Sequence, residues 1–271
     1  MALLGKGEYG RVKVIKVNTH RFALKETDLG VFPEDLEVVM ACLREEAMNC
    51  EHPNIIKRYW CRFWKNTFQL CMEVGEPVYS ADGTEVLNQI GQGLRFMHSQ
   101  GFIHRDVKPA NIVRVGNTLK LIDFGLTRKG DGQTKLSGYM ISRWFRPPEM
   151  LLANFDHINY DGRVDMYSLA LTAFLLQNGR PLFFGPTEEI LKQFNRYKLV
   201  SEGLFKHLIC DYNDRYTSEE MFSKYKIPLI PGTLGGIVER TGNVASFVEC
   251  MVKGLEDDAT SYAHEMIYSD L

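Results

Sequence analysis

The sequence lacks the features of several protein classes. Its 271 residues contain no uninterrupted apolar run of ~18 residues, the length that a transmembrane helix needs. Residues 1–7 have no apolar core like that of a signal peptide. No internal repeat, low-complexity tract or linker is present. We therefore expect a soluble, intracellular protein, located in the cytoplasm, the nucleus or both, with no membrane partner.

Paired cysteine motifs are missing as well. The six cysteines include no C-x-x-C pair and no histidine at metal-ligand spacing. They are Cys42, Cys50, Cys61, Cys71, Cys210 and Cys250. This pattern predicts free, mostly buried thiols in a reducing compartment rather than a disulfide framework.

An excess of one charge is also missing. The 32 basic and 34 acidic residues give a net charge of -2, so charge provides no reason to expect nucleic acid as a partner. The one local exception is the basic, aromatic run at residues 57–65, whose alternation is more typical of a strand with one solvated face. The length exceeds the usual single-domain size, which predicts one large or two packed lobes.

The hydrophobic pattern divides the chain near Val74 and Gly75. Before this point it predicts strands at residues 11–17, 20–26, 57–63 and 67–74, and one amphipathic helix that begins near Pro33 and continues to Ala47. After it, helices are expected at residues 84–99, 164–177, 188–197 and 245–255. A small sheet-rich lobe and a larger helical lobe predict a cleft between them, a common location for ligands.

An ordered series of short motifs is the most informative feature that is present. The series consists of glycines at 5, 7 and 10, A-L-K at 23–25, H-R-D-V-K-P-A-N at 104–111, D-F-G at 123–125 and P-P-E at 147–149. Each motif alone could arise by chance. Together, in this order, they supply the parts that a transfer of phosphate from ATP requires.

The glycine loop and Lys25 are candidates for binding the phosphates. Gly5, Gly7 and Gly10 would let backbone amides approach a triphosphate without a Cβ in the way. The loop lies between two predicted strands, which argues against a dinucleotide fold, where a helix should follow. A plain glycine-rich hairpin and a solvated strand lysine are the alternative interpretations.

The segment at 104–111 is more specific. Asp106 can accept the proton of an attacking hydroxyl, and Lys108 can neutralise charge on the transferred phosphoryl group. Asn111 and Asp123 offer the oxygen ligands that Mg²⁺ prefers. His104 could be a general base or a metal ligand, but no second ligand accompanies it, so we expect a core-packing histidine.

These motifs resemble those of eukaryotic-type protein kinases across nearly the full chain. The closest resemblance is to the CMGC group of cyclin-dependent, MAP and glycogen synthase kinases. Residues 142–149 are similar to the group's T-R-W-Y-R-A-P-E, residues 180–185 to its P-L-F-P-G, and residues 52–74 can be laid on a cyclin-dependent kinase without a gap. The resemblance implies an α+β, bilobal protein kinase fold over residues 1–271. Its β-rich N-lobe with one main helix would span 1–74 and its larger, mainly helical C-lobe 75–271, with 200–243 in the place of the group's insert.

The resemblance also implies roles for further residues. Glu45 would pair with Lys25 and complete a catalytic set with Asp106 and Lys108, and Asp165 would brace the catalytic loop. Lys108 together with Ser142 indicates serine or threonine as the acceptor. Met72 would be the gatekeeper, with Glu73 and Gly75 as hinge groups. The whole set expected to bind ATP is Leu4, Gly5, Lys6, Gly7, Glu8, Tyr9, Gly10, Val12, Ala23, Lys25, Met72, Glu73, Gly75 and Val113.

Two tyrosines and a serine lie where related kinases are regulated. Ser137 and Tyr139 fall where MAP kinases have T-x-Y, and a phosphate there would face the basic residues Arg105, Arg143 and Arg146. The hypothesis is that Tyr139 is phosphorylated in the active form, and the alternative is an unmodified loop. Tyr9 occupies the place of an inhibitory tyrosine in cyclin-dependent kinases, or is only an apolar loop tip.

The sequence departs from the family pattern in two places. Glu45 lies seven residues before His52 (52 − 45) instead of about nine, so the intervening turn is shortened and Glu46 is a rival. Thr260 stands where an arginine is expected to pair with Glu149. Either another arginine, such as Arg240, serves this role or the glutamate is more hydrated than usual.

The expected protein is a monomeric serine/threonine protein kinase that uses ATP and Mg²⁺ on a protein substrate. An activating subunit or an upstream kinase would be its regulatory partner. The alternative is a pseudokinase that binds ATP or acts as a scaffold, although pseudokinases usually lose one of the positions held here by Lys25, Asp106 and Asp123. A small-molecule phosphotransferase would not need residues 142–149. The chain begins just before the glycine loop, which suggests a compact or viral genome and, in that case, a location in the host cell.

Overall fold

The chain forms two compact units in the computed structural model. The structure describes residues 3–6, 10–28, 48–64, 67–130, 135–137, 143–153 and 157–237. The first unit comprises residues 1–51, 56–74 and 233–271, and the second comprises 52–55 and 75–232. The expected division into lobes at 1–74 and 75–271 stays a prediction. The helices expected at 33–47 and 245–255 lie outside the described residues.

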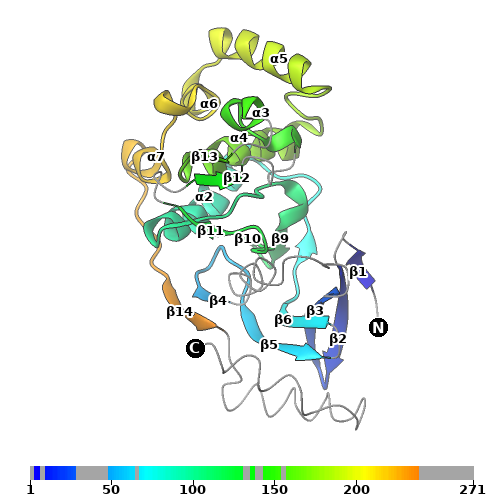
Figure 1. Cartoon of the computed structure of the whole chain (residues 1–271). Coiled ribbons are helices and arrows are strands. Elements are labelled where there is room, and N and C mark those ends of the chain that lie inside the picture. The colour runs from blue at the N-terminus through cyan, green and yellow to red at the C-terminus, as the bar shows by residue number, and fades with distance from the viewer. Residues whose placement is uncertain are drawn as a thin grey trace. The chain divides into compact units, whose positions relative to one another are not determined.

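The first unit is built on a five-stranded antiparallel sheet (Figure 1). In sheet order its strands are β1 (Leu3–Lys6), β2 (Gly10–Val17), β3 (His20–Asp28), β6 (Thr67–Glu73) and β5 (Arg58–Trp64). The four strands predicted from the sequence are thereby confirmed. A two-residue turn joins β2 to β3, and Asn18 in it has a φ of 51°, which asparagine tolerates better than most residues.

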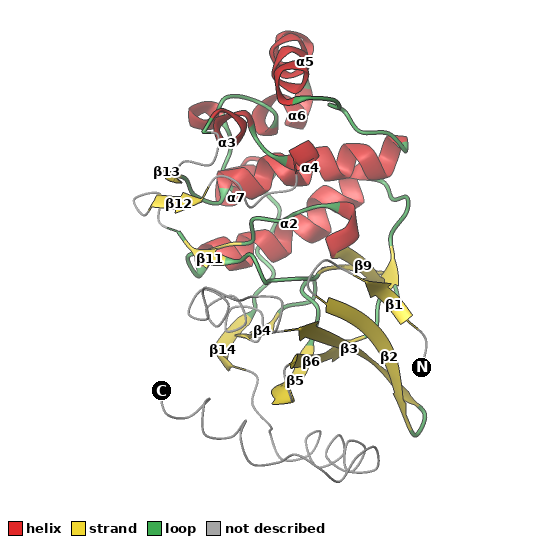
Figure 2. Cartoon of the chain, turned by 45° about the vertical axis from the view of Figure 1, so that its right-hand side comes forward, coloured by secondary structure: helices red, strands yellow, loops and turns green. Residues whose placement is uncertain are grey.

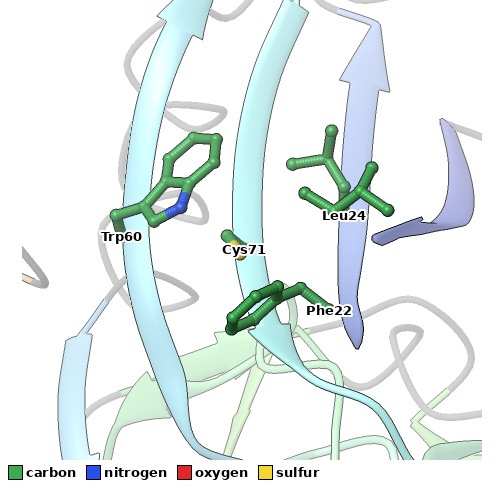
Figure 3. Close-up of a cluster of buried hydrophobic side chains, with 5 residues drawn as sticks. Phe22, Leu24, Trp60 and Cys71 are labelled. Atoms are coloured by element: carbon green, nitrogen blue, oxygen red, sulfur yellow. The ribbon is translucent and has the colours of Figure 1, made fainter. Parts of the chain in front are cut away.

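One face of this sheet carries an apolar cluster (Figure 3). The cluster consists of Ile15, Phe22, Leu24, Trp60 and Cys71, each no more than 9% exposed, with Tyr59 packed against it. The ring of Tyr59 meets that of Phe22 edge-on at 5.3 Å between centroids. Because side chains alternate along a strand, Val12, Ala23, Lys25 and Met72 belong to the opposite face. The basic, aromatic run is thus a strand, as predicted, but its expected solvated face is wrong in part, since Arg58 is 5% exposed.

A second, two-stranded sheet in the first unit was not predicted. Strand β4 (Met48–Glu51) pairs antiparallel with β14 (Thr233–Ile237). The two strands are separated by most of the sequence. Strands of only four and five residues carry too little periodicity to be recognised from the sequence.

The second unit is mainly helical (Figures 1 and 2). Its two central helices, α2 (Gly83–Ser99) and α4 (Arg163–Asn178), lie side by side and confirm two predicted helices. Val86, Ile90 and Leu94 of α2 are fully buried, and so is most of α4. The remaining helices are α3 (Pro148–Leu152), α5 (Thr187–Val200), α6 (Gly203–Leu208) and α7 (Ser218–Lys224), with 3₁₀ turns η2 (Pro109–Asn111), η4 (Arg143–Phe145) and η5 (Tyr212–Asp214). Among the described helices, none is long and apolar enough to cross a membrane.

Short strands surround the predicted catalytic motifs in the second unit. Strands β7 (Glu76–Pro77), β9 (Ile112–Val115) and β10 (Thr118–Leu121) form one sheet. Strand β8 (Phe102–Ile103) pairs with β11 (Arg128–Lys129), and β12 (Lys135–Ser137) pairs with β13 (His157–Asn159). The loop at 104–111 therefore runs from β8 to β9, with the D-F-G motif between β10 and β11.

Candidate catalytic site

His104 is a packing residue of the catalytic loop, as predicted. Its ring is fully buried, with Nε2 3.1 Å from the Ile122 carbonyl and Nδ1 accepting the Asp106 backbone N–H at 3.2 Å. Burial lowers the pKa of His104, although nearby carboxylates oppose the shift. Because both ring nitrogens are used within the protein, a neutral His104 has no lone pair left for a metal or a substrate proton.

Asp165 braces the same loop, in agreement with the resemblance. Its fully buried carboxylate accepts the backbone N–H groups of His104 and Arg105, each at 2.8 Å, and the His98 ring nitrogen at 2.9 Å. Burial alone would raise the pKa of Asp165, but the bond from His98 and the other donors lower it overall. Arg105 is held with a φ of 71°, an unusual conformation for a residue with a side chain. The contacts from Asp165 keep the backbone in this conformation.

His98 was missed in the sequence analysis. It lies at the end of α2, where its second ring nitrogen is 2.9 Å from the Ser218 hydroxyl at the start of α7. The available signal was a histidine four residues after Leu94, on the apolar stripe of a predicted helix. Such a histidine is more often a satisfied core residue, and here its contacts connect Asp165 to α7.

Asp106, Lys108 and Asn111 are brought together by the turn η2. Lys108 Nζ lies 2.6 Å from Asp106 Oδ2, and Asn111 Nδ2 donates to the same oxygen at 2.7 Å and to the Asp106 carbonyl at 2.8 Å. Asp106 is 6% exposed, whereas the Lys108 side chain is 26% exposed. The arrangement holds one carboxylate in a fixed orientation beside a cation, as a group that accepts a substrate proton next to developing negative charge requires.

Asp123 is positioned by the residue before it. Ile122 donates its N–H to the Asn111 carbonyl at 2.9 Å and accepts from His104 with its own carbonyl. Asp123 follows with a φ of 62°, and the Phe124 ring meets that of His104 at 5.1 Å. Non-glycine residues with positive φ are uncommon and concentrate at functional sites, so Asp123 is a candidate functional residue by its backbone as well as its type.

Asn111 and Asp123 fit the requirements of Mg²⁺. Both N–H bonds of the Asn111 amide go to Asp106, which leaves its oxygen as the group for a cation. An amide oxygen and a carboxylate are hard donors, and Mg²⁺ is usually bound by one or two carboxylates together with waters and substrate phosphates. No cluster of three or more His, Cys, Asp or Glu that could hold a metal occurs in the part of the chain that the structure describes. A two-residue protein contribution is therefore consistent with Mg²⁺ and not with structural zinc.

Four of the nucleotide residues predicted in the first unit share one face of its sheet. Val12 is directly opposite Lys25, and Ala23 is directly opposite Met72, so all four side chains belong to the face away from the apolar cluster. Gly10 lies on β2 where a Cβ would approach the Glu26 carbonyl to 2.1 Å, so a side chain is excluded there. Glu73 accepts the Lys57 backbone N–H at 3.4 Å from the end of β6.

Gly75 and Val113 are brought together in the second unit. A Cβ at Gly75 would lie 2.4 Å from a Val113 methyl carbon, because Glu76 and Pro77 of β7 pair with β9 beside it.

Leu4, Gly5 and Lys6 lie in β1, with Gly5 opposite Val12 and Lys6 opposite Arg11. The remaining predicted residues, Gly7, Glu8, Tyr9, Glu45, Glu46, Tyr139 and Ser142, are outside the described residues, and their roles stay predictions.

Glu149 has a partner that the sequence analysis did not identify. Arg215 forms two parallel hydrogen bonds to its carboxylate, at 2.7 and 3.0 Å, and donates to the Cys210 carbonyl at 2.9 Å. The expectation that another arginine serves this role is therefore confirmed, and the arginine is Arg215, whereas Arg240, the example named, lies outside the described residues. Arg215 was missed because it falls within residues 200–243, which the resemblance assigned to an insert.

The four cysteines among the described residues are free thiols, as predicted. Cys50 and Cys71 are buried, and burial raises the pKa of Cys50 to about 11 and that of Cys71 to about 12. Cys210 is partly buried, with its pKa raised to about 11 by the same cause. Thiols with raised pKa values are poor nucleophiles, so these residues contribute packing rather than chemistry.

Comparison with known proteins agrees with this site. The family described as protein kinase domain matches residues 1–253. The chain is 31% identical over 198 residues to a probable serine/threonine-protein kinase of Dictyostelium discoideum and 35% identical over 209 residues to cyclin-dependent kinase F-4 of rice. It is 28% identical over 235 residues to the mitogen-activated protein kinase HOG1 of Arthrobotrys oligospora.

These matches cover 68, 71 and 84% of this chain and 38, 44 and 58% of the respective relatives. The chain belongs to the protein kinase domain family. Cyclin-dependent and mitogen-activated kinases among its relatives confirm the resemblance to the CMGC group. The β-rich first unit and helical second unit confirm the predicted fold class.

Proposed function

We propose that this chain is an active serine/threonine protein kinase that transfers the γ-phosphoryl group of ATP to a hydroxyl of a protein substrate. The observation that supports this most strongly is the orientation of Asp106 by Lys108 and Asn111, at distances of 2.6 and 2.7 Å. Asp106 would accept the proton of the attacking hydroxyl. Lys108 would stabilise the charge of the phosphoryl group in transfer.

The residues proposed to hold ATP include Val12, Ala23, Lys25, Met72, Gly75 and Val113. Asn111 and Asp123 would hold Mg²⁺, which supplies charge neutralisation at the phosphates when it is bound. Protein kinases use ATP and Mg²⁺ generally, and the residues that this chemistry needs are present here. The short Asn111 bonds to Asp106 would make metal binding and proton acceptance parts of one rigid structure.

The acceptor class rests on the residues after Asp106 and on the relatives. Lys108 together with Ser142 resembles the pattern of serine/threonine kinases rather than that of tyrosine kinases. Two of the relatives are named as serine/threonine-protein kinases, which supports the same acceptor class. The substrate would be a protein, and the cyclin-dependent and mitogen-activated relatives favour a regulatory subunit or an upstream kinase as a further partner.

The experiment is transfer from γ-labelled ATP to a mixed peptide library, followed by analysis of the phosphorylated amino acid. We expect label on serine and threonine, and a rate lowered by ~10²–10⁴ in Asp106→Asn. Label on tyrosine alone would refute the acceptor class. Equal background incorporation by the wild type and Asp106→Asn would refute the enzyme and support a pseudokinase scaffold.

A further inference from the structure

An open apolar cavity lies at the end of α4 in the second unit. Its volume of about 510 Å³ is within the range of cavities that bind ligands. Its lining includes Trp144 of η4, Phe174 of α4 and, from the loop between α4 and α5, Arg180, Leu182 and Phe184. Arg180 is the charged residue of this lining. The cavity therefore combines apolar and aromatic walls with one cation.

The loop before α5 is anchored so that one of its two phenylalanines stays at the surface. Phe183 is 2% exposed, and its ring meets that of Tyr197 edge-on at 5.7 Å between centroids. Phe184 is 61% exposed, although its N–H donates to Gln193 Oε1 at 3.2 Å and its carbonyl accepts from Gln193 Nε2 at 2.9 Å. Trp144 is 52% exposed. Large exposed aromatic side chains on a fixed backbone are typical of a surface that another protein covers, since groups that are already ordered lose little entropy on binding.

Helix α4 connects this cavity to the catalytic loop. Ser168 Oγ donates to the carbonyl of Phe145, the residue after the cavity's tryptophan, at 2.8 Å. One turn further along α4, Thr172 Oγ1 lies 3.4 Å from the carbonyl of Val107, the residue after Asp106. Both hydroxyl side chains are buried, and four residues of helix place them about 6 Å apart along its axis. The spacing between the cavity and the catalytic loop is therefore fixed by one helix.

A molecule held at the catalytic loop is thus the occupant that the position of the cavity favours. Its apolar walls suit an aromatic or aliphatic side chain, and the exposed Arg180 suits a carboxylate beside that side chain. We propose that the cavity binds an apolar side chain of the protein substrate, next to an Asp or Glu of the same substrate that pairs with Arg180. The inference rests on the proposed kinase function and adds to it the feature by which a substrate is selected.

The test uses the whole chain and a library of peptides in which one serine is flanked on both sides by random residues. After transfer from γ-labelled ATP, the phosphorylated peptides are sequenced. We expect an aromatic or aliphatic residue next to Asp or Glu at a fixed distance from the serine. In Arg180→Glu the preference for Asp or Glu should change to Lys or Arg. Arg196→Glu, the same charge change at an exposed position of α5, is the matched control and should keep the acidic preference.

A peptide of the selected sequence then measures the apolar contact. In Phe184→Ala its kcat/KM should fall at least about tenfold, a usual cost for the loss of a side chain that carries binding energy. Leu199→Ala, a truncation at an 83% exposed position of α5, is the control and should keep the wild-type kcat/KM.

Three results would overturn the proposal. The first is an active wild type whose selected peptides contain no apolar–acidic pair, and the second is a preference that neither Arg180→Glu nor Phe184→Ala changes. The third is a wild-type dimer that Phe184→Ala dissociates in sedimentation without a change in kcat/KM, which would assign the cavity to a second copy of the chain. A wild type that phosphorylates no peptide instead refutes the proposed function together with this inference.

Discussion

Arg215 binds Glu149 through two parallel hydrogen bonds while its own side chain is completely buried and that of Glu149 is 22% exposed. The guanidinium lies 4.9 Å from the Tyr167 ring centroid and 5.9 Å from that of Tyr212. The pair joins the first turn of α3 to the segment between η5 and α7. This contact fixes the P-P-E motif against the body of the second unit.

Removal of Arg215 should strongly destabilise the protein. In Arg215→Met the Glu149 carboxylate loses its bidentate partner, and breaking a buried pair of this kind typically costs about 3–5 kcal/mol. Chemical denaturation measures the free energy of unfolding. The matched control is Lys198→Ala, which breaks an exposed pair with Asp211 and should cost less than about 1 kcal/mol. Equal losses in both variants would contradict the structural role of Arg215.

Substitution of Asp123 should change the requirement for Mg²⁺. We expect Asp123→Asn to raise the Mg²⁺ concentration for half-maximal activity by at least about tenfold, a loss typical even for outer-shell partners of a metal ligand. Asp161→Asn removes the same charge from a position paired with Arg163 at 3.6 Å and should leave the requirement unchanged. A Mg²⁺ titration of phosphate transfer provides the readout. An unchanged titration in Asp123→Asn would show that this carboxylate is no ligand.

Burial of His104 should make stability depend on pH. The pKa of His104 is lowered in the folded chain. As the pH falls below the ordinary histidine pKa of about 6.5, the unfolded chain therefore binds a proton that the folded chain does not bind. The free energy of unfolding should therefore decrease from pH 7 toward pH 5, by up to about 1.4 kcal/mol per pH unit for each such proton. His52, buried against Phe96 with a lowered pKa, adds to the same effect.

The contribution of His104 can be separated from that of His52. In His104→Phe the slope of unfolding free energy against pH should become smaller over this range, and the His52 contribution should remain. Urea denaturation at several pH values measures both slopes. A slope identical to that of the wild type would mean that His104 does not titrate on unfolding.

Substitution of Asp165 should lower the rate of phosphoryl transfer rather than weaken nucleotide binding. Asp165→Asn retains the shape of the side chain, but the carboxylate that accepts three hydrogen bonds is replaced by an amide with only one acceptor oxygen. The backbone of Arg105 and its neighbour Asp106 is then no longer held in place. We expect kcat per folded molecule to fall by about tenfold or more. The KM for ATP should change much less. A loss confined to KM would contradict the bracing role.

The catalytic loop was predictable from sequence because its chemistry depends on residue types at short, fixed spacing. Asp106, Lys108 and Asn111 lie within six residues of one another in the chain, around the turn η2, so their mutual contacts follow from local structure. The longer strands and helices were also predictable, since each is long enough to show its hydrophobic period.

Contacts between distant segments were not predictable in the same way. Arg215 and Glu149 are 66 residues apart, and β4 and β14 are separated by most of the chain. A buried arginine looks like a surface arginine in the sequence, because only the tertiary fold brings its partner to it. The strands β8 and β11 have only two residues each, too few to show a hydrophobic period in the sequence.

We propose that Asp106 takes part in the chemistry of phosphoryl transfer rather than in nucleotide binding. The most direct measurement compares wild type and Asp106→Asn for both the dissociation constant of ATP with Mg²⁺ and the kcat of transfer to a serine peptide. For Asp106→Asn we expect an unchanged dissociation constant and a kcat lowered at least about 100-fold. ATP binding without transfer by the wild type, or equal kcat values in the two proteins, would contradict it.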